Sequence, residues 1–470
     1  MISRRQLVAA LGTLPAAGLL SPGSLYAQAA RQFPRRTLGR TGVPVVPLGL
    51  GGQASLQWTK PGIDAPDIIV RAVQLGLNYL DTANVYGASQ MQYGEAFRRL
   101  HLTPSDSNYN RALRGSLYIA TKTRARFALD PANQPTAIDD LKRSLTQIFG
   151  DGKGFIPDGA YLDAIQCHNL QALADVDQIY EGLADRGTGK PERIGALAGL
   201  LDYRDGTNYT GLNPEHRIWV RHIGITGHFS SAVLMSAIRR DTADVIDTVL
   251  VALNANDRTF SAHQNNVLPL ARARGLGVIA MKIFADGAFY GKEPHFSTTP
   301  ADVNLAVGKN GAIAYSDLVR YPLSLPGVSC EIIGTGHIDR QRQEADQMVA
   351  NLAASLQDLP SETERLRIEN DAAARHAGSN YFQEKRGLVQ PSGVKIKRDG
   401  DRLVVMWNTA LAGAEPIQSY EIRAGQRTLL TLPFRPQLTE APITAIVPVA
   451  SIASDPVTVI ASEAPPRARA

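Results

Sequence analysis

Four side chains that can exchange protons each follow a short apolar run of the sequence. Asp81 ends the run that starts at Leu77, and Tyr86 lies five positions after that acid. Lys122 ends SLYIATK, and His168 ends YLDAIQCH. If the runs are parallel strands, an acid, a phenol, an ammonium and an imidazole converge on one mouth at the carboxyl ends of the strands. Such a group could transfer protons in acid–base chemistry.

Strand and helix patterns alternate from about residue 36 and would position these side chains. Eight strand–helix units in about 320 residues predict an α/β fold, a (β/α)8 TIM barrel, rather than an open doubly wound sheet. The strands lack polar alternation, as expected when both faces are buried. Strands are predicted at 45–52, 77–81, 117–121, 161–166, 222–225, 245–253, 277–281 and 331–333. Helices are predicted at 66–75, 95–100, 137–149, 176–183, 232–239, 267–274, 312–320 and 340–354.

Two connections are longer than a barrel needs. Residues 150–159 and 196–217 show no clear periodicity and follow predicted helices. We expect both to be surface elaborations at the amino-terminal end of the barrel, away from the mouth.

The composition changes after a predicted helix at 361–377. From Pro391 onward, VKIKRDGDRLVVMWN, IQSYEIRAG, TLLTLP, ITAIVPV and VTVIAS read as strands separated by turns. With Trp407 and Tyr420 as core aromatic residues, this part resembles a fibronectin type III sandwich, a small all-β domain. The alternative is a β-hairpin extension packed on the barrel. As a sandwich, it is a candidate for contact with a cell surface or a glycan.

The first residues resemble a twin-arginine export signal. The pair Arg4-Arg5 precedes an apolar stretch at 7–20, which is too short to span a bilayer, and a small-residue cleavage site follows at 27–29. We expect a periplasmic protein without an integral membrane segment in its mature chain; the alternative is a flexible basic terminus. The predicted division is a signal peptide at 1–29, a barrel at 30–360, a helical linker at 361–388 and a sandwich at 389–470.

Overall composition excludes several classes of site. The net charge of +5, with 20% charged residues, is a mild excess without a basic stripe, so no nucleic-acid partner is expected. The two cysteines, Cys167 and Cys330, have neither metal-site nor disulfide-framework spacing, and no metal is predicted.

The barrel segment resembles the aldo-keto reductase family over about residues 36–348. The matching pieces are RTLGRTGVPVVPLGLGG, LGLNYLDTANVYGASQMQYGEAF, IATK, AIQCH, GITGH, GVIAMK and LPGVSCEIIGT. The most specific is D-T-A-x-x-Y-G, and the variants GITGH and AMK are similar to a bacterial oxidoreductase branch.

The resemblance implies that Asp81, Tyr86, Lys122 and His168 form the catalytic tetrad of an NAD(P)(H)-dependent carbonyl reductase. Hydride transfer to a carbonyl creates an alkoxide, which Tyr86 would protonate. A free phenol has a pKa of about 10, and we expect the Lys122 ammonium to lower it. Asp81 would keep Lys122 charged, and His168 would orient the substrate oxygen.

The resemblance also implies a nicotinamide dinucleotide, with NADP(H) favoured over NAD(H). Gly51 and Gly52 match G-x-G-x-x-A, but Pro61-Gly62 interrupts the helix that a dinucleotide fingerprint needs. We interpret these glycines as allowing close approach to the nicotinamide ribose. The other candidate cofactor residues, by position, are Thr226, Gly227, His228, Asn254, Lys282, Gly334, Thr335, Gly336 and Arg340.

Three functional hypotheses therefore stand. The first is reduction of an aldehyde or ketone, a small-molecule carbonyl substrate, with Tyr86 as the proton donor. The second is an exported binding protein. The third is a dehydrogenase that retains its cofactor and passes electrons to an external acceptor.

Overall fold

The computed structural model describes residues 34–59, 61–132, 134–184, 192–259, 262–290, 297–303, 313–334, 358–374, 387–448 and 455–466. The predicted signal, the predicted helix at 340–354, and Thr335, Gly336 and Arg340 lie outside these ranges.

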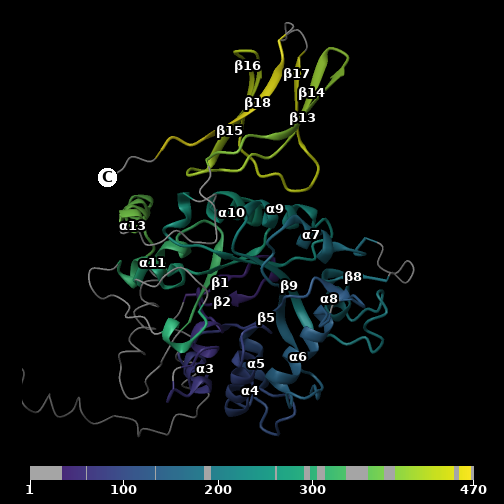
Figure 1. Cartoon of the computed structure of the whole chain (residues 1–470), viewed down its shortest axis with the longest axis vertical. Coiled ribbons are helices and arrows are strands. Elements are labelled where there is room, and N and C mark those ends of the chain that lie inside the picture. The colour runs from purple at the N-terminus through teal and green to yellow at the C-terminus, as the bar shows by residue number, and fades with distance from the viewer. Residues whose placement is uncertain are drawn as a thin grey trace, which may run out of the picture.

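A closed barrel of parallel strands forms the main body (Figure 1). Around the barrel the strands are β3 (Leu48–Leu50), β4 (Tyr79–Asp81), β5 (Tyr118–Thr123), β7 (Leu162–Cys167), β9 (Val220–Gly227), β10 (Thr248–Ala252), β11 (Gly277–Met281) and β12 (Val328–Ile333). β12 pairs in parallel with β3, and this pairing closes the ring. The predicted TIM barrel is therefore confirmed.

Helices cover the outside of the barrel. They are α3 (Ala65–Gln74), α4 (Ser89–Arg99), α5 (Arg111–Ser116), α6 (Ala137–Phe149), α7 (Leu173–Tyr180), α8 (Ala196–Asp205), α9 (Ser231–Arg240), α10 (His263–Ala273) and α11 (Tyr315–Leu323). Short 3-10 turns are η1 (Gly39–Thr41), η2 (Ala54–Leu56), η3 (Asp257–Thr259), η4 (Ala285–Tyr290) and η5 (Pro300–Val303). In the part of the chain described here, no helix has both the length and the apolar character needed to cross a membrane.

The expectation that residues 196–217 are an aperiodic surface connection is wrong. Their first half is α8, and Ala196, Leu200 and Leu201 are among its buried residues. A helix buried on almost every side carries no polar stripe, so it lacks the periodicity that reveals a surface helix. The connection at 150–159, in contrast, contains no helix or strand, as expected.

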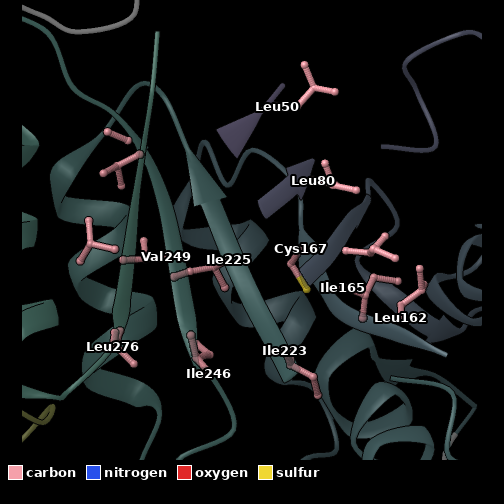
Figure 2. Packing of buried hydrophobic residues seen from close by; sticks show 14 of the residues in the cluster. Leu50, Leu80, Leu162, Ile165, Cys167, Ile223, Ile225, Ile246, Val249 and Leu276 are labelled. Atoms are coloured by element: carbon pink, nitrogen blue, oxygen red, sulfur yellow. The ribbon is translucent and has the colours of Figure 1, made fainter. Parts of the chain in front are cut away.

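The packing is divided between two apolar layers. The larger cluster lies between the strands and the helices and includes Leu80, Ile165 and Val249 (Figure 2). The smaller cluster fills the barrel interior, where Tyr79 and Tyr118 stack with ring centroids 5.3 Å apart.

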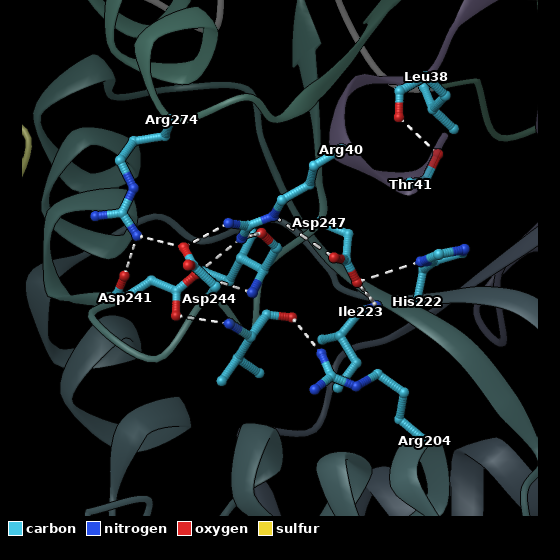
Figure 3. Close-up of polar contacts among 12 residues, drawn as sticks. Leu38, Arg40, Thr41, Arg204, His222, Ile223, Asp241, Asp244, Asp247 and Arg274 are labelled. Atoms are coloured by element: carbon cyan, nitrogen blue, oxygen red, sulfur yellow. Dashed lines mark hydrogen bonds and ion pairs between the residues drawn. The ribbon is translucent and has the colours of Figure 1, made fainter. Parts of the chain in front are cut away.

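The amino-terminal end of the barrel is closed by a short hairpin and a charged network. The hairpin consists of β1 (Arg36–Thr37) and β2 (Pro44–Val45). Leu38 extends from it into the interior cluster. Beside it, Arg40 pairs with Asp244 at 2.5 Å, and Arg274 pairs with the same carboxylate at 2.9 Å (Figure 3). Structural contacts of charged side chains therefore concentrate at this end of the barrel. A second small pairing joins β6 (Phe127–Leu129) to β8 (Ile194–Gly195).

The C-terminal part forms two facing antiparallel sheets after helix α13 (Glu362–Ala374). The strands are β13 (Ser392–Asp399), β14 (Arg402–Asn408), β15 (Ile417–Ala424), β16 (Arg427–Pro433), β17 (Ile443–Pro448) and β18 (Val457–Glu463). Trp407 from one sheet meets Tyr420 from the other, with ring centroids 5.5 Å apart, in a separate apolar core. The alternative of a simple hairpin extension is wrong, because this part has its own core. Its fibronectin type III character stays a prediction.

Candidate active site

The carboxyl ends of β4 and β5 bring Asp81 and Lys122 into a buried ion pair. Lys122 Nζ lies 2.5 Å from Asp81 Oδ1 and donates a second hydrogen bond, of 2.9 Å, to the carbonyl oxygen of Thr82. Each side chain is at most 1% exposed. Burial raises the pKa of Asp81 and lowers the pKa of Lys122, and the contact between the two charges opposes both shifts. The pair is thus held together where neither charge reaches water.

Tyr86 lies in the loop after β4, with its ring against this pair. Lys122 Nζ is 4.7 Å from the ring centroid, and the residue is 7% exposed. Among the residues whose placement is described, none forms a hydrogen bond with the Tyr86 hydroxyl. It is therefore a donor that a bound molecule could use.

The net lowering of the Tyr86 pKa that we expected from Lys122 is not found. Burial raises the pKa of the phenol well above its usual value, and the carboxylates of Asp81 and Asp286 raise it further. The Lys122 ammonium is paired with Asp81 and lies over the Tyr86 ring. Its effect on the pKa of the hydroxyl is therefore smaller than the effect of burial. The phenol therefore stays protonated at neutral pH, which is the state a proton donor needs.

His168 follows β7 directly and faces Tyr86. The two rings meet edge to face, with centroids 5.8 Å apart and an angle of 84° between their planes. Burial first, and then the charge of Lys122, holds the pKa of His168 well below its usual range, so the imidazole is neutral. Its buried Nδ1 finds no hydrogen-bond partner within the described ranges. The ring can therefore contact a substrate oxygen.

Amide and hydroxyl side chains behind the tetrad were missed from the sequence. Asn84 Nδ2 donates to the Lys122 carbonyl oxygen at 3.2 Å and to Ser144 Oγ at 3.0 Å. Gln90 Nε2 donates to the same Ser144 oxygen at 2.8 Å. Asn84 ties the loop that carries Tyr86 to β5 and α6. It lies inside D-T-A-N-V-Y-G, so the motif itself was the available signal.

A second imidazole, from His228, stands at the end of β9. Its Nδ1 lies 2.8 Å from Asn169 Oδ1, and its ring centroid is 6.5 Å from that of His168. Thr226 Oγ1 accepts a 2.7 Å hydrogen bond from the Asn169 backbone, so Thr226 contacts the turn after His168. Asn169 was not predicted. It adopts a positive φ of 56°, which an asparagine tolerates better than most residues.

The glycines at the mouth are explained by packing within the barrel. A Cβ on Gly52 would lie 2.2 Å from the carbonyl oxygen of Asp81, and one on Gly51 would lie 3.2 Å from the backbone of β12. A Cβ on Gly227 would lie 2.9 Å from Leu234. Neighbouring chain therefore already requires glycine at these positions, and close approach of Gly51 and Gly52 to a nicotinamide ribose stays a prediction.

Asn254 and Lys282 lie beside each other at the ends of β10 and β11. Asn254 Nδ2 donates a 3.3 Å hydrogen bond to the Lys282 carbonyl oxygen. Lys282 Nζ lies 3.0 Å from Asp286 and 3.1 Å from Gln53 Oε1. Gly334 follows β12 and is exposed.

The residues present suit a dinucleotide. The Lys282 ammonium matches phosphate, and the neutral imidazoles match amide and hydroxyl groups. The buried Gln57 Oε1 and Trp58 Nε1 have no hydrogen-bond partner in the described part of the chain. Gln57 lies against Gly87, immediately after Tyr86. An unpartnered polar side chain, Gln57, therefore lies against the loop that carries Tyr86.

Comparison with known proteins gives matches that include this part of the chain. The aldo/keto reductase family matches residues 47–196. The L-galactose dehydrogenase of Arabidopsis thaliana is 24% identical over 377 residues, covering 76% of this chain and 97% of that protein.

Solved structures give further matches. The holo form of an aldo-keto reductase from Bacillus halodurans has 18% identity and a TM-score of 0.45, covering 72% of this chain and 96% of that one. The glycerol dehydrogenase of Gluconobacter oxydans has 17% identity and a TM-score of 0.46, covering 73% and 96%.

The barrel and its mouth are those of a TIM-barrel oxidoreductase. More particularly, the chain is an oxidoreductase that is similar to the aldo/keto reductase family over residues 47–196.

Proposed function

We propose that the barrel interconverts a carbonyl and an alcohol with NAD(P)(H), and that Tyr86 donates the proton in the reducing direction. The observation that carries this proposal is the protonated, unpartnered Tyr86 hydroxyl beside the His168 ring and the buried Lys122–Asp81 pair. A bound nicotinamide would supply the hydride to the carbonyl carbon.

The side chains would act on the carbonyl oxygen. Negative charge develops on that oxygen as the hydride arrives, and the Tyr86 hydroxyl transfers its proton to it. The neutral His168 ring orients the oxygen, and Lys122 stabilises the phenolate that remains. The phenolate then recovers a proton from water at the mouth. In the oxidising direction the same phenolate removes the alcohol proton.

The cofactor would lie along the carboxyl ends of the later strands. Lys282 and Asn254 are the candidates for its phosphates, and Thr226 and His228 for its nicotinamide end. We favour NADP(H) over NAD(H) on the sequence position of Arg340.

The named relative suggests where to look for the substrate. Because the Arabidopsis protein is called L-galactose dehydrogenase, aldoses belong in the substrate panel beside simple aldehydes and ketones.

Fluorescence titration of the chain lacking residues 1–29 with NADPH and NADH tests the nucleotide site. We expect binding of NADPH at micromolar concentration or tighter, and then turnover of at least one carbonyl compound or aldose. Absence of binding for both nucleotides would contradict the proposal.

The cofactor-retaining dehydrogenase is the second candidate, because export would separate the enzyme from a replenished cofactor pool. We propose export on residues 1–29 alone, with cleavage after Ala29. Nucleotide that co-purifies, and is reoxidised in place by an artificial acceptor, would favour this candidate. A mature N-terminus that still contains Arg4-Arg5 would contradict the export proposal.

A further inference from the structure

The C-terminal sandwich is attached to the barrel by side chains at the edge of the mouth. The loop between β14 and β15 contacts the first turn of α10, where Asn266 pairs with the backbone of Ala412. Asn266 Nδ2 donates to the Ala412 carbonyl oxygen at 3.1 Å, and the Ala412 amide donates to Asn266 Oδ1 at 2.8 Å. Both residues are buried. Figure 1 shows the sandwich over α9 and α10, with α13 beside them.

Arg258, in η3, joins three parts of the chain at this contact. Its Nη1 lies 2.8 Å from Glu369 of α13, and its Nη2 pairs with Glu415 of the sandwich. Its Nε donates to the Ala414 carbonyl oxygen at 3.2 Å. The guanidinium is 14% exposed, and the two carboxylates are 5% and 6% exposed, so water screens these pairs little.

The same 3-10 turn is connected to the residues proposed to hold the nucleotide. The Asp257 amide donates to the Asn254 carbonyl oxygen at 3.2 Å, and the Asn256 amide donates to Asn254 Oδ1 at 2.9 Å. Asn254 Nδ2 reaches the carbonyl oxygen of Lys282. A continuous set of contacts therefore runs from the sandwich, through Arg258 and the turn, to the ends of β10 and β11.

We propose that Arg258 is a positioning residue for the nucleotide, and that the docked sandwich is a structural part of the nucleotide half of the site. The proposal rests on the proposed function. By fixing η3 between Glu369 and Glu415, Arg258 holds Asn254 and Lys282 in place. The sandwich is then a fixed support for the barrel mouth rather than a freely tethered module.

The chain offers a matched control at the other end of the same interface. Arg274 also bridges barrel and sandwich, donating to the Leu438 carbonyl oxygen at 3.1 Å, but it lies in the charged network at the closed end of the barrel (Figure 3). Arg274→Met therefore removes a docking contact that is remote from the nucleotide.

The test compares NADPH dissociation constants, kcat at saturating NADPH, and thermal unfolding of the whole chain. Arg258→Met should raise the dissociation constant by about tenfold or more, because small displacements of binding groups weaken contacts strongly. It should leave kcat at saturation within about threefold, because the tetrad is untouched. Arg258→Lys should recover only part of the affinity. A lysine ammonium lacks the planar fork of donors with which Arg258 contacts two carboxylates and a carbonyl oxygen at once. Arg274→Met should leave the dissociation constant within about twofold.

Each contrary result has a separate meaning. Unchanged affinity in Arg258→Met would overturn the positioning role and leave the proposed function standing. An equal loss in Arg274→Met would also overturn it, because the effect would then be general destabilisation. A wild-type chain that binds neither nucleotide would overturn both proposals.

Discussion

At the scale of single residues, burial decides the protonation states in the mouth. The Lys122–Asp81 contact opposes the neutralisation that burial alone would cause. Removing one partner of a buried pair leaves the other charge without compensation, which typically lowers stability by about 3–5 kcal/mol. The pair is therefore a structural requirement, apart from the catalytic role that we propose for it.

A double-mutant cycle on this pair should show strong coupling. Asp81→Asn should lower the free energy of unfolding by about 3 kcal/mol, because Lys122 then loses its counter-charge. Adding Lys122→Met should recover part of that loss without restoring turnover. Urea denaturation measures the first effect and a carbonyl-reduction assay the second. Effects that simply add would show that the two charges do not depend on each other.

The convergence of Asp81, Tyr86, Lys122 and His168 could be predicted, because each lies in a short, specific motif near a strand end. The protonation of Tyr86 could not. It depends on burial and on Asp286, a residue 200 positions further along the chain, which the fold brings close. Asn169 was missed for a similar reason, because its partner His228 comes from another strand.

At the scale of elements, close contact between two helices explains why a glycine outside the candidate site is required. A Cβ on Gly94 in α4 would lie 2.2 Å from the Gln147 carbonyl oxygen of α6. Gly115 in α5 is also helical, but a Cβ there would meet nothing within 4 Å.

These two glycines form a matched pair for alanine substitution. Gly94→Ala should destabilise the chain by about 1–3 kcal/mol, because α4 and α6 must separate. Gly115→Ala should be neutral or stabilise by up to about 1 kcal/mol, since alanine favours helix. Thermal unfolding measures the stability of both variants. An equal change in stability at the two sites would contradict the close packing of α4 on α6.

Helices with one polar face were predicted closely, as α6 illustrates at Ala137–Phe149. α8 was missed because a buried helix shows no periodicity. Gly51 and Gly52 were predicted to end a strand. The need for glycine at these two positions could not be predicted, because the atoms that leave no room for a Cβ belong to β4 and β12.

At the scale of the whole molecule, buried histidines make stability depend on pH. His263 is fully buried, its Nδ1 lies 2.9 Å from Ser231 Oγ, and burial lowers its pKa to about 4. An unfolded chain binds a proton at this histidine below a pH of about 6.5, whereas the folded chain does not. Stability from His263 is therefore present above that pH and is lost as pH falls towards the folded pKa.

Comparison with His263→Gln isolates this contribution, because Glu331, whose pKa burial raises, titrates in the opposite sense. The stability advantage of wild type over the variant should shrink by about 2 kcal/mol between pH 7 and pH 5. Urea denaturation at both pH values measures it. A constant difference would show that His263 takes up a proton as readily in the folded chain as in the unfolded chain.

The two-part architecture was predictable from the change of pattern near residue 390, but the docking of the sandwich was not. That contact depends on Arg258, Glu369 and Glu415, which lie in three distant segments and belong to no motif. In the sequence alone such charged residues cannot be distinguished from ordinary solvated ones, because only the fold brings them together.

Replacing Tyr86 by phenylalanine tests the central claim most directly, because it removes one hydroxyl and keeps the ring. NADPH affinity and carbonyl reduction would be measured on the same preparation, with wild type alongside. We predict that the variant binds NADPH within a few fold of wild type and that its turnover falls by at least about a hundredfold. Turnover that survives the loss of this hydroxyl would contradict the assignment of Tyr86 as the proton donor.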